Sequence, residues 1–393
     1  MNSERLGVAV IGAGMAGRAH ADAYRTASTL YGPGLPDIDL VAIADINEQV
    51  GAETARRFGY KRSETDWHRV AEADDIDVVS VVVANDLHRE IVEALLAGGK
   101  HVLCEKPFAP TIEDAQAMVD AAARTDLQAG VGFSFRRSPA INAVRHEILE
   151  GSLGKPVHFN ARYWCDYGAD PNAPLSWRYK GRPGSGALAD IGSHVIDTAE
   201  FLCGPIASIS GAQLHTAYTE RALPAGHTVG HSAAELSDIV EPVENEDFAT
   251  FTVRFVSGTV GSLSASRIAF GWPNSLGFEV FAQNGAASFD LARAGEFSYF
   301  EPGLKPSTQG YRQVLIGPQH PYIAGGLAMD FPAVNYGQND LFVFQARAFL
   351  EQVAGLHNLD PVPSFEHGLR NLRIMDAVVR SAQSGGAEVQ VDK

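Results

Sequence analysis

The sequence predicts two domains: a doubly wound α/β domain, then an α+β domain with a large, mostly antiparallel open sheet. Short apolar strands alternate with helical segments up to about residue 133, as in a parallel sheet covered by helices on both faces. From Pro156 onward, strands with a period of two dominate, and this pattern is typical of antiparallel pairing. We therefore expect one domain over residues 1–133 and a second over residues 134–393.

The first domain opens with a glycine-rich turn between a strand and a helix. Residues 6–11 are apolar, the run Gly12-Ala13-Gly14-Met15-Ala16-Gly17 follows, and a helix is expected over 18–29. In that context the glycines allow a tight turn and close backbone approach to a pyrophosphate, which the amides of the helix N-terminus then meet. The segment predicts a Rossmann-type dinucleotide site formed by Gly12, Gly14, Met15, Ala16 and Gly17.

The ends of the next strands supply further candidate cofactor contacts. Asp45 follows the apolar run 40–44 and is placed to accept hydrogen bonds from an adenosine ribose. The eleven residues 45–55 contain no Arg or Lys that would hold a 2′-phosphate, so the sequence favours NAD over NADP. Asn85 and His88 follow the buried strand 76–84 and can touch the cofactor, although helix capping is an alternative for Asn85.

A strand over residues 99–104 leads into Glu105-Lys106-Pro107. Proline restricts the residue before it to extended geometry, so Lys106 is expected at the carboxyl end of a strand, where open α/β sheets bind ligands. We expect Glu105 and Lys106 beside the cofactor, with Lys106 able to steady an alkoxide. A surface Glu–Lys pair is the alternative. Farther on, a helix is expected over 112–123 after Thr111, and a strand over 128–135.

The second domain carries an acid and a base close together. Asp190 and His194 are four residues apart after a glycine-rich turn, so a helix would place both on one face. A carboxylate one turn from an imidazole suits the transfer of a hydroxyl proton. A solvated or capping role for the pair is the alternative.

Together, these three segments resemble the Gfo/Idh/MocA oxidoreductases, which include glucose-fructose oxidoreductase and inositol dehydrogenase, and the resemblance spans nearly the whole chain. It implies that Lys106, Asp190 and His194 are catalytic and line a sugar site beside the nicotinamide of NAD. It also implies a cis Lys106–Pro107 bond. A last helix at about residues 366–381 would pack back on the nucleotide domain.

Within the family, the likeness extends to a subgroup of sugar dehydrogenases that oxidise a C3 hydroxyl. Three stretches carry it, at residues 135–140, 169–178 and 317–322. The expected substrate contacts are Phe135, Arg136, Cys165, Trp177, Arg178 and His320. Phe135 and Cys165 stand where the resemblance leads us to expect a tyrosine and a glutamine, and each change removes a hydrogen-bonding group.

These features predict an NAD-dependent dehydrogenase that oxidises a secondary hydroxyl, at C3, of a pyranose, anhydrosugar, glycoside or cyclitol. His194 would take the hydroxyl proton and Asp190 would orient or charge-stabilise the imidazole, while Lys106 would steady the oxyanion. Lys106 as the base is a variant of this mechanism. Two alternatives are an NAD-dependent glycosidase that oxidises C3 transiently, and a catalytically silent sugar or nucleotide sensor.

Composition limits the partners and the compartment. The 393 residues carry a net charge of −16, which argues against nucleic acid and anionic membranes as partners. No apolar stretch approaches the roughly 20 residues that span a bilayer, and the N-terminus leads straight into a strand without room for a signal peptide. Three cysteines without metal-ligand spacing suit a reducing compartment. We expect a cytoplasmic protein without a metal site.

The second domain is expected to contain strands over 157–164, 206–215, 248–255, 259–268, 276–282 and 286–290, with helices over 341–353 and 366–381. One face of the sheet would carry the helix of Asp190 and His194. The other would be apolar and covered by another subunit, so a homodimer or homotetramer is expected. Residues 216–246 are expected to form a solvated acidic loop that contains Glu235, Asp238, Glu241, Glu244 and Glu246.

Overall fold

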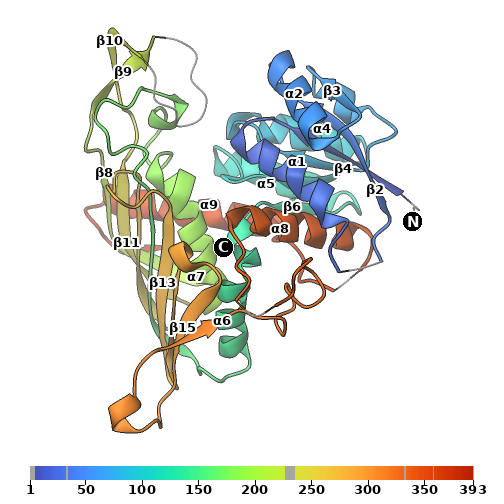
Figure 1. Ribbon diagram of the computed structural model, residues 1–393. Coiled ribbons are helices and arrows are strands. Elements are labelled where there is room, and N and C mark those ends of the chain that lie inside the picture. The colour runs from blue at the N-terminus through green and yellow to red at the C-terminus, as the bar shows by residue number, and fades with distance from the viewer. Residues whose placement is uncertain (1–4, 32–33, 226–234, 332, 357, 393) are drawn as a thin grey trace. The chain divides into compact units, whose positions relative to one another are not determined.

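The structure is a computed structural model that describes residues 5–31, 34–225, 235–331, 333–356 and 358–392. The chain forms two compact units (Figure 1). The first comprises Met1–Arg137 and Gly317–Leu372, and the second comprises Ser138–Ile316 and Arg373–Lys393. Residues 317–372 thus group with the first 137 residues, whereas the sequence-based division assigned them to the second domain.

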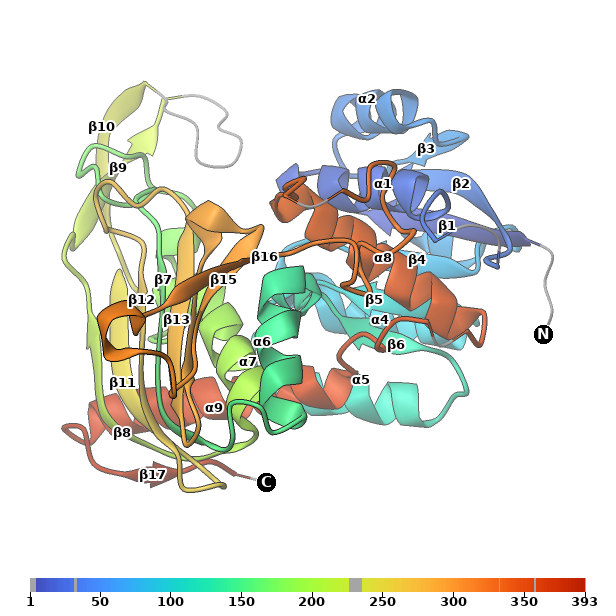
Figure 2. The ribbon, with the colours of Figure 1, turned by 60° about the horizontal axis from the view of Figure 1, so that its bottom comes forward.

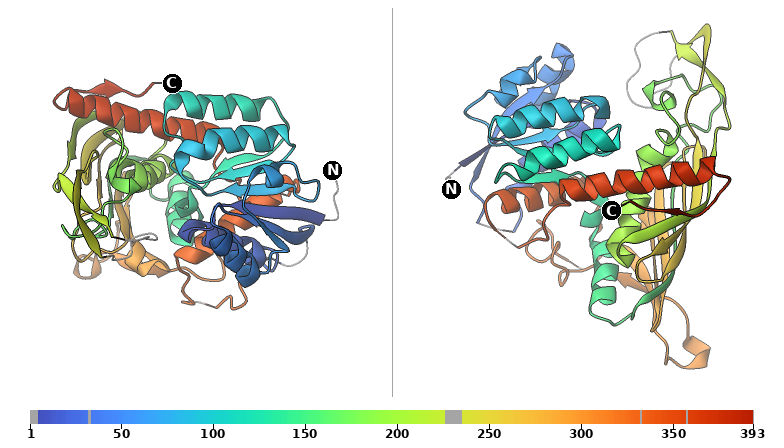
Figure 3. Two further views of the ribbon diagram at one scale, coloured as in Figure 1. Left: turned by 90° about the horizontal axis from the view of Figure 1, so that it is seen from above. Right: turned by 180° about the vertical axis from the view of Figure 1, so that it is seen from behind.

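The first unit contains a parallel sheet with the strand order β3-β2-β1-β4-β5-β6. The order reverses between β1 and β4, and such a switch point is where α/β sheets bind ligands. Helices α1, α2 and α8 lie on one face, and α4 and α5 lie on the other (Figure 3). The bounds are β1 Arg5–Ile11, α1 Met15–Ala27, β2 Asp37–Ala44, α2 Glu48–Phe58, β3 Arg62–Glu64, α3 His68–Ala71, β4 Val78–Val81, α4 His88–Ala97, β5 His101–Cys104, α5 Ile112–Ala123, β6 Ala129–Val131 and α8 Gln338–Val353.

The second unit contains a larger sheet with the order β16-β15-β14-β13-β7-β12-β11-β8-β17. Its pairs are antiparallel except β7 with β12, and helices α6 and α7 pack on one face (Figure 2). The predicted fold class is therefore confirmed. The bounds are α6 Pro139–Leu149, β7 Pro156–Trp164, α7 Ser193–Cys203, β8 Ile206–His215, β9 Glu220–Pro224, β10 Leu236–Pro242, β11 Phe248–Phe255, β12 Val260–Ser266, β13 Ser275–Ala282, β14 Ala286–Asp290, β15 Glu296–Phe300, β16 Arg312–Leu315 and β17 Val389–Gln390.

Helix α9, Phe365–Gln383, begins in the first unit and ends in the second. Its first turns pack within the first unit, where the ring of Phe365 lies 4.7 Å from that of Phe108. Gly368 lies against the same Phe108 ring, which leaves no space for a Cβ at that position. No helix in the described ranges is long and apolar enough to cross a membrane.

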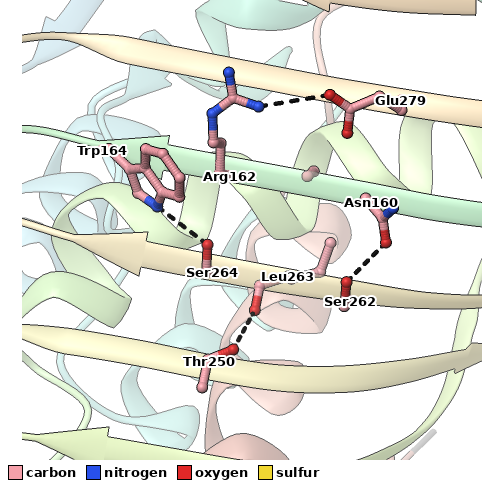
Figure 4. Close-up of a pocket in the computed structure, with 9 residues that line it drawn as sticks. Asn160, Arg162, Trp164, Thr250, Ser262, Leu263, Ser264 and Glu279 are labelled. Atoms are coloured by element: carbon pink, nitrogen blue, oxygen red, sulfur yellow. Dashed lines mark hydrogen bonds and ion pairs between the residues drawn. The ribbon is translucent and has the colours of Figure 1, made fainter. Parts of the chain in front are cut away.

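The outward face of the second sheet is polar, so the expectation of an apolar face is wrong. Trp164 Nε1 donates to Ser264 Oγ (3.1 Å), and Ser262 Oγ donates to Asn160 Oδ1 (2.7 Å). These side chains line a pocket on that face (Figure 4). The period-two strands put their aliphatic residues under the helices and leave polar residues on the other side.

The segment expected to be a solvated acidic loop includes regular secondary structure. It contains the hairpin of β9 and β10, while residues 226–234 lie outside the described ranges. Glu241 and Glu244 form ion pairs with Lys180 at 2.9 and 3.3 Å. Glu246 is only 3% exposed, so the hypothesis of a solvated side chain is wrong for this residue.

A buried ion pair lies beside Glu246. Arg267 and Asp247 are both fully buried, with 2.8 Å between Nε and Oδ1. Arg267 also donates to Asn245 Oδ1 (2.9 Å) and to the Arg178 carbonyl (2.8 Å). The other Asp247 oxygen accepts from the amides of Ala217 and Tyr218. The pair therefore ties β11, β12 and the segment around Arg178 together.

We predict that Asp247→Ala lowers the free energy of unfolding in urea by about 3–5 kcal/mol, because it leaves the Arg267 guanidinium buried without its counter-charge. The matched control is Asp39→Ala, which removes an equally direct pair of Arg and Lys contacts at the surface and should change stability little. Equal losses in the two variants would contradict a special role for the buried pair.

Candidate active site

The glycine-rich turn has the geometry of a phosphate cradle. Gly12 has a φ of +98°, and a Cβ at Gly17 would clash with the Gly12 carbonyl oxygen, whereas a Cβ at Gly14 would meet no atom within 4 Å. Helix α1 starts at Met15, followed by Ala16, with no capping side chain and no acidic residue in its first turn. Its N-terminus therefore presents amide donors and the positive end of the helix dipole.

Asp45 holds this turn against the end of β2. Its Oδ2 accepts from the Ala13 amide (2.8 Å) and its Oδ1 accepts from the Asn47 amide (2.9 Å). Each carboxylate oxygen has a second lone pair, so the side chain can still accept hydrogen bonds from a ribose.

Two other predicted cofactor residues follow β4. Asn85 begins a single 3₁₀ turn, Asn85–Leu87. The ring nitrogens of His88 lie 3.0 Å from the Phe108 carbonyl oxygen and 3.1 Å from that of Val83, and burial lowers the pKa of this imidazole. These contacts make His88 a support for two turns, and its assignment to the cofactor stays a prediction.

Lys106 lies at the end of β5 and precedes a cis bond to Pro107, as the family resemblance implied. The side chain of Glu105 is buried beneath this turn. Its Oε2 accepts from the Lys106 amide (3.1 Å), and its Oε1 lies 3.0 Å from Nε2 of His20. Glu105 therefore contacts protein groups with both oxygens, and its assignment to the cofactor stays a prediction.

The other predicted residues of the first unit follow β6 and begin the 317–372 segment. Phe135 and Arg136 belong to the 3₁₀ turn Ser134–Arg137, in which Phe135 is buried. His320 is half-buried, and its Nδ1 accepts from the Tyr322 amide (3.2 Å). The neighbouring Arg137, which sequence analysis did not single out, donates to the Tyr322 hydroxyl (3.0 Å) and anchors this segment.

In the second unit, a π-helical turn precedes the helix of His194. The turn spans Leu188–Gly192 and contains Asp190, so the expected regular α-helical spacing is interrupted between the two residues. Glu246 fixes the start of this helix because its carboxylate accepts from the amides of Gly184 (2.7 Å) and Leu188 (3.0 Å). π-Turns within helices occur frequently at functional sites.

The Asp190 carboxylate is held by two side chains of the preceding segment. Tyr167 donates to Oδ2 at 2.6 Å, and Nε of Arg178 lies 3.9 Å from the same oxygen. Burial and the adjacent carboxylate raise the pKa of Tyr167, so its phenol stays protonated and remains a donor. Arg178 also stacks on the exposed ring of Trp177, 4.4 Å from its centroid.

His194 is buried, and its ring centroid lies 5.9 Å from that of Tyr163. The Tyr163 hydroxyl donates to Asn274 Oδ1 (2.7 Å). Cys165 is buried just past the end of β7, where its amide donates to the Ser266 carbonyl. Sequence analysis missed both tyrosines. The period of two in β7 could have placed Tyr163 on the helix-covered face, but no sequence signal marks Tyr167.

The second unit thus combines a fixed carboxylate, a neutral phenol, a guanidinium, an imidazole and an exposed indole face. A carboxylate and an imidazole can accept or transfer hydroxyl protons, and an aromatic face suits the C–H side of a sugar ring. In the described ranges, no group of three or more His, Cys, Asp or Glu side chains is placed to hold a metal.

Comparison with known proteins agrees with this chemistry. A family model described as "Oxidoreductase family, NAD-binding Rossmann fold" matches residues 6–133, and the "GFO/IDH/MocA C-terminal domain" matches residues 141–288. Levoglucosan dehydrogenase from Pseudarthrobacter phenanthrenivorans is 36% identical over 96% of both chains. Myo-inositol 2-dehydrogenase from Thermotoga maritima is 26% identical over 73% of this chain and 75% of its own.

Solved structures agree as well. Levoglucosan dehydrogenase in complex with NADH and levoglucosan superposes with a TM-score of 0.89 at 35% identity, covering 99% of this chain and all of that one. These relatives confirm the predictions of an NAD-dependent sugar or cyclitol dehydrogenase and of NAD as the cofactor. The chain belongs to the Gfo/Idh/MocA family of NAD-binding oxidoreductases.

Proposed function

We propose that this protein oxidises a secondary hydroxyl, at C3, of a pyranose, anhydrosugar, glycoside or cyclitol by hydride transfer to NAD. The observation that carries the proposal is the group of Asp190, Tyr167 and Arg178 on the helix and segment that also hold His194 and Trp177. The names of two relatives, levoglucosan dehydrogenase and D-glucoside 3-dehydrogenase, support a sugar substrate and oxidation at C3.

The residues of the first unit fit NAD. The open space at Gly14 and the uncapped start of α1 suit a pyrophosphate, and Asp45 suits the adenosine ribose. When bound, NAD supplies the acceptor for the hydride of the carbinol carbon. Because Asp45 is anionic, its charge also disfavours a 2′-phosphate at that ribose.

The catalytic roles divide among three side chains. His194 takes the hydroxyl proton, Lys106 stabilises the developing oxyanion, and Asp190 supplies fixed negative charge for the imidazolium or for a substrate hydroxyl. Lys106 as the base is the variant of this mechanism. The anchoring of Asp190 by Tyr167 and Arg178 supports a carboxylate that stays in place during the reaction.

The substrate specificity is proposed to depend on Phe135, Arg136, Cys165, Trp177, Arg178 and His320. Trp177 offers an exposed ring face and Arg178 a guanidinium with hydrogen-bond donors. Phe135 and Cys165 make their positions less polar than the tyrosine and glutamine expected there. The preferred sugar should therefore differ from that of relatives with the polar pair.

A homo-oligomer and a cytoplasmic location are further parts of the proposal. The outward face of the second sheet, with its pocket at Arg162 and Glu279, is the proposed interface between copies, which would be held by hydrogen bonds and ion pairs because this face is polar. All three cysteines are buried thiols, which suits a reducing compartment.

We predict opposite effects of adding one methyl group at two glycines of the turn. Gly14→Ala should unfold at the wild-type temperature but bind NADH more weakly, because the new Cβ meets no protein atom and fills the pyrophosphate cradle. Gly17→Ala should lose thermal stability because its Cβ clashes with the Gly12 carbonyl. Melting curves and NADH fluorescence titrations measure both effects. Unchanged NADH affinity in Gly14→Ala would contradict the proposed cradle.

We predict NADH formation from NAD with at least one member of a panel of levoglucosan, glucose, methyl glucosides and inositols. His194→Ala and Lys106→Met should each lower kcat by about 10²- to 10⁴-fold. If the two residues act on the same hydroxyl, the double variant should lose less than the product of the two factors. No NADH from any sugar despite tight NAD binding would favour the glycosidase or the sensor.

We predict that Tyr167→Phe lowers kcat/KM by about 10- to 100-fold, the size of a lost hydrogen bond to a charged group. Tyr218→Phe is the control, because it also removes a phenol hydrogen bond, to the Ala169 carbonyl at 3.0 Å, without contacting Asp190. Steady-state kinetics with the sugar identified above measures both variants. Equal losses would show that Tyr167 acts only through the local fold.

A further inference from the structure

We propose that His20 is a positioning residue for Lys106: it orients the buried Glu105 carboxylate, which in turn holds the Lys106 amide. The proposal rests on the proposed function in that Lys106 is taken to serve the reaction. The residues involved all belong to the first unit, and a continuous row of hydrogen bonds joins them.

His20 lies on α1, one turn beyond Gly17, and is 2% exposed. Its Nε2 lies 3.0 Å from Glu105 Oε1, and its Nδ1 lies 3.0 Å from Ser80 Oγ. The Ser80 oxygen is in turn 2.8 Å from the Tyr24 hydroxyl. The edge of the imidazole also packs on Phe342 of α8, with 5.3 Å between ring centroids. Both ring nitrogens and the contact with Phe342 thus fix the orientation of the imidazole.

The chemistry of the groups fixes the direction of the row. An ionised carboxylate only accepts, so Nε2 of His20 donates to Glu105. When the imidazole is neutral, its Nδ1 accepts a hydrogen bond from the Ser80 hydroxyl, whose oxygen in turn accepts one from Tyr24. Burial raises the pKa of Tyr24, so this phenol remains a donor. With a neutral imidazole, this arrangement gives each polar atom of the row a partner and corresponds to the Nε2–H tautomer.

The far end of the row fixes the turn that carries Lys106. Glu105 Oε2 accepts from the Lys106 amide at 3.1 Å. On the side of β6 the carboxylate lies directly against the backbone of Gly132, where an added Cβ would clash with Oε1. The four-carbon stem of a lysine is flexible, so the position of its backbone determines which points the ammonium reaches.

The row also links two parts of the nucleotide site. Helix α1 carries both the amides that meet the pyrophosphate and the His20 ring, so the Lys106 turn is fixed relative to the glycine turn. An aliphatic core would hold the sheet together at lower desolvation cost than a buried carboxylate. Packing alone therefore does not explain the polar row, whereas positioning the Lys106 turn does.

His20→Leu tests the proposal, with His20→Gln as the conservative variant that keeps a donor near the Nε2 position. We expect kcat to fall about 10- to 100-fold in His20→Leu, as misplacement of a reacting group by about 1 Å does, with KM for NAD within about 2-fold of wild type. His20→Gln should recover much of kcat. Tyr60→Phe is the control, because Tyr60 is a buried phenol that donates to the Ala21 carbonyl of the same helix; it should keep wild-type kcat.

Two readouts do not depend on turnover. In ¹⁵N-histidine spectra, the signal that disappears in His20→Gln should show a proton on Nε2. In Glu105→Gln, where the side-chain amide can donate, the proton should move to Nδ1. The rate at which an amine-reactive ester acylates Lys106 in the NADH complex, measured by peptide mass, should change in His20→Leu and not in Tyr60→Phe.

The outcomes separate the two proposals. If wild type oxidises no sugar, the proposed function fails, while the acylation rate and the tautomer still test the role of His20. If His20→Leu retains wild-type kcat and wild-type Lys106 acylation, or if His20→Gln and His20→Leu lose kcat and melting temperature in equal measure, the positioning role is overturned.

Discussion

The buried ion pair between Arg267 and Asp247 is the interaction on which the second unit's functional side chains depend. Arg267 holds the carbonyl of Arg178, and Asn245 accepts from Arg267 while it donates to the carbonyls of Arg178 and Lys180. Glu246, between Asn245 and Asp247, caps the helix of Asp190 and His194. Three consecutive residues therefore place both the helix and the segment that faces its carboxylate.

Placing the helix and the Arg178 segment through a buried ion pair carries a high desolvation cost. Removing two charges from water costs several kcal/mol each, and the attraction between them offsets the cost only when the remaining hydrogen bonds are made. Here they are made: both oxygens of Asp247 are occupied, and Arg267 has three acceptors. Its guanidinium also lies 4.3 Å from the centre of the Tyr179 ring. Because these hydrogen bonds are directional, they define the relative orientation of the groups, which aliphatic contacts would not do.

The same device recurs at each functional turn of the chain. Asp45 accepts the amide of Ala13 in the glycine turn, Glu105 accepts the amide of Lys106, and Glu246 accepts amides at the start of the Asp190 helix. A carboxylate bound to a backbone amide is a charge-assisted hydrogen bond, stronger and shorter than a neutral one. The backbone is thus fixed independently of the side chain that performs the chemistry, which leaves the side chains of Lys106 and Asp190 to contact other groups.

Local patterns were enough to predict most of the elements. The bounds of β8, β11 and β14 agree with those expected from the period of two, and α5 begins after its Thr111 cap as expected. The strand expected over 128–135 ends at Val131, because Ser134–Arg137 turns into a 3₁₀ segment. The roles of Glu246 and Tyr167 depend on residues about 60 and 23 positions away, and no local pattern contains such contacts. From its charge, Glu246 was even expected to be solvated, whereas it is buried.

In the helix of Asp190 and His194, such long-range contacts give a geometry that differs from the one predicted by the spacing of the two residues. A spacing of four suggested one face of an α-helix, with the carboxylate orienting the imidazole. The π-turn at Leu188–Gly192 interrupts that regularity, and Asp190 is engaged by Tyr167 and Arg178, while the His194 ring lies beside Tyr163. A carboxylate held by a phenol and an arginine from outside the helix keeps its position independently of the regular i, i+4 geometry. The position of Asp190 is therefore set by tertiary contacts that the spacing of the motif does not contain.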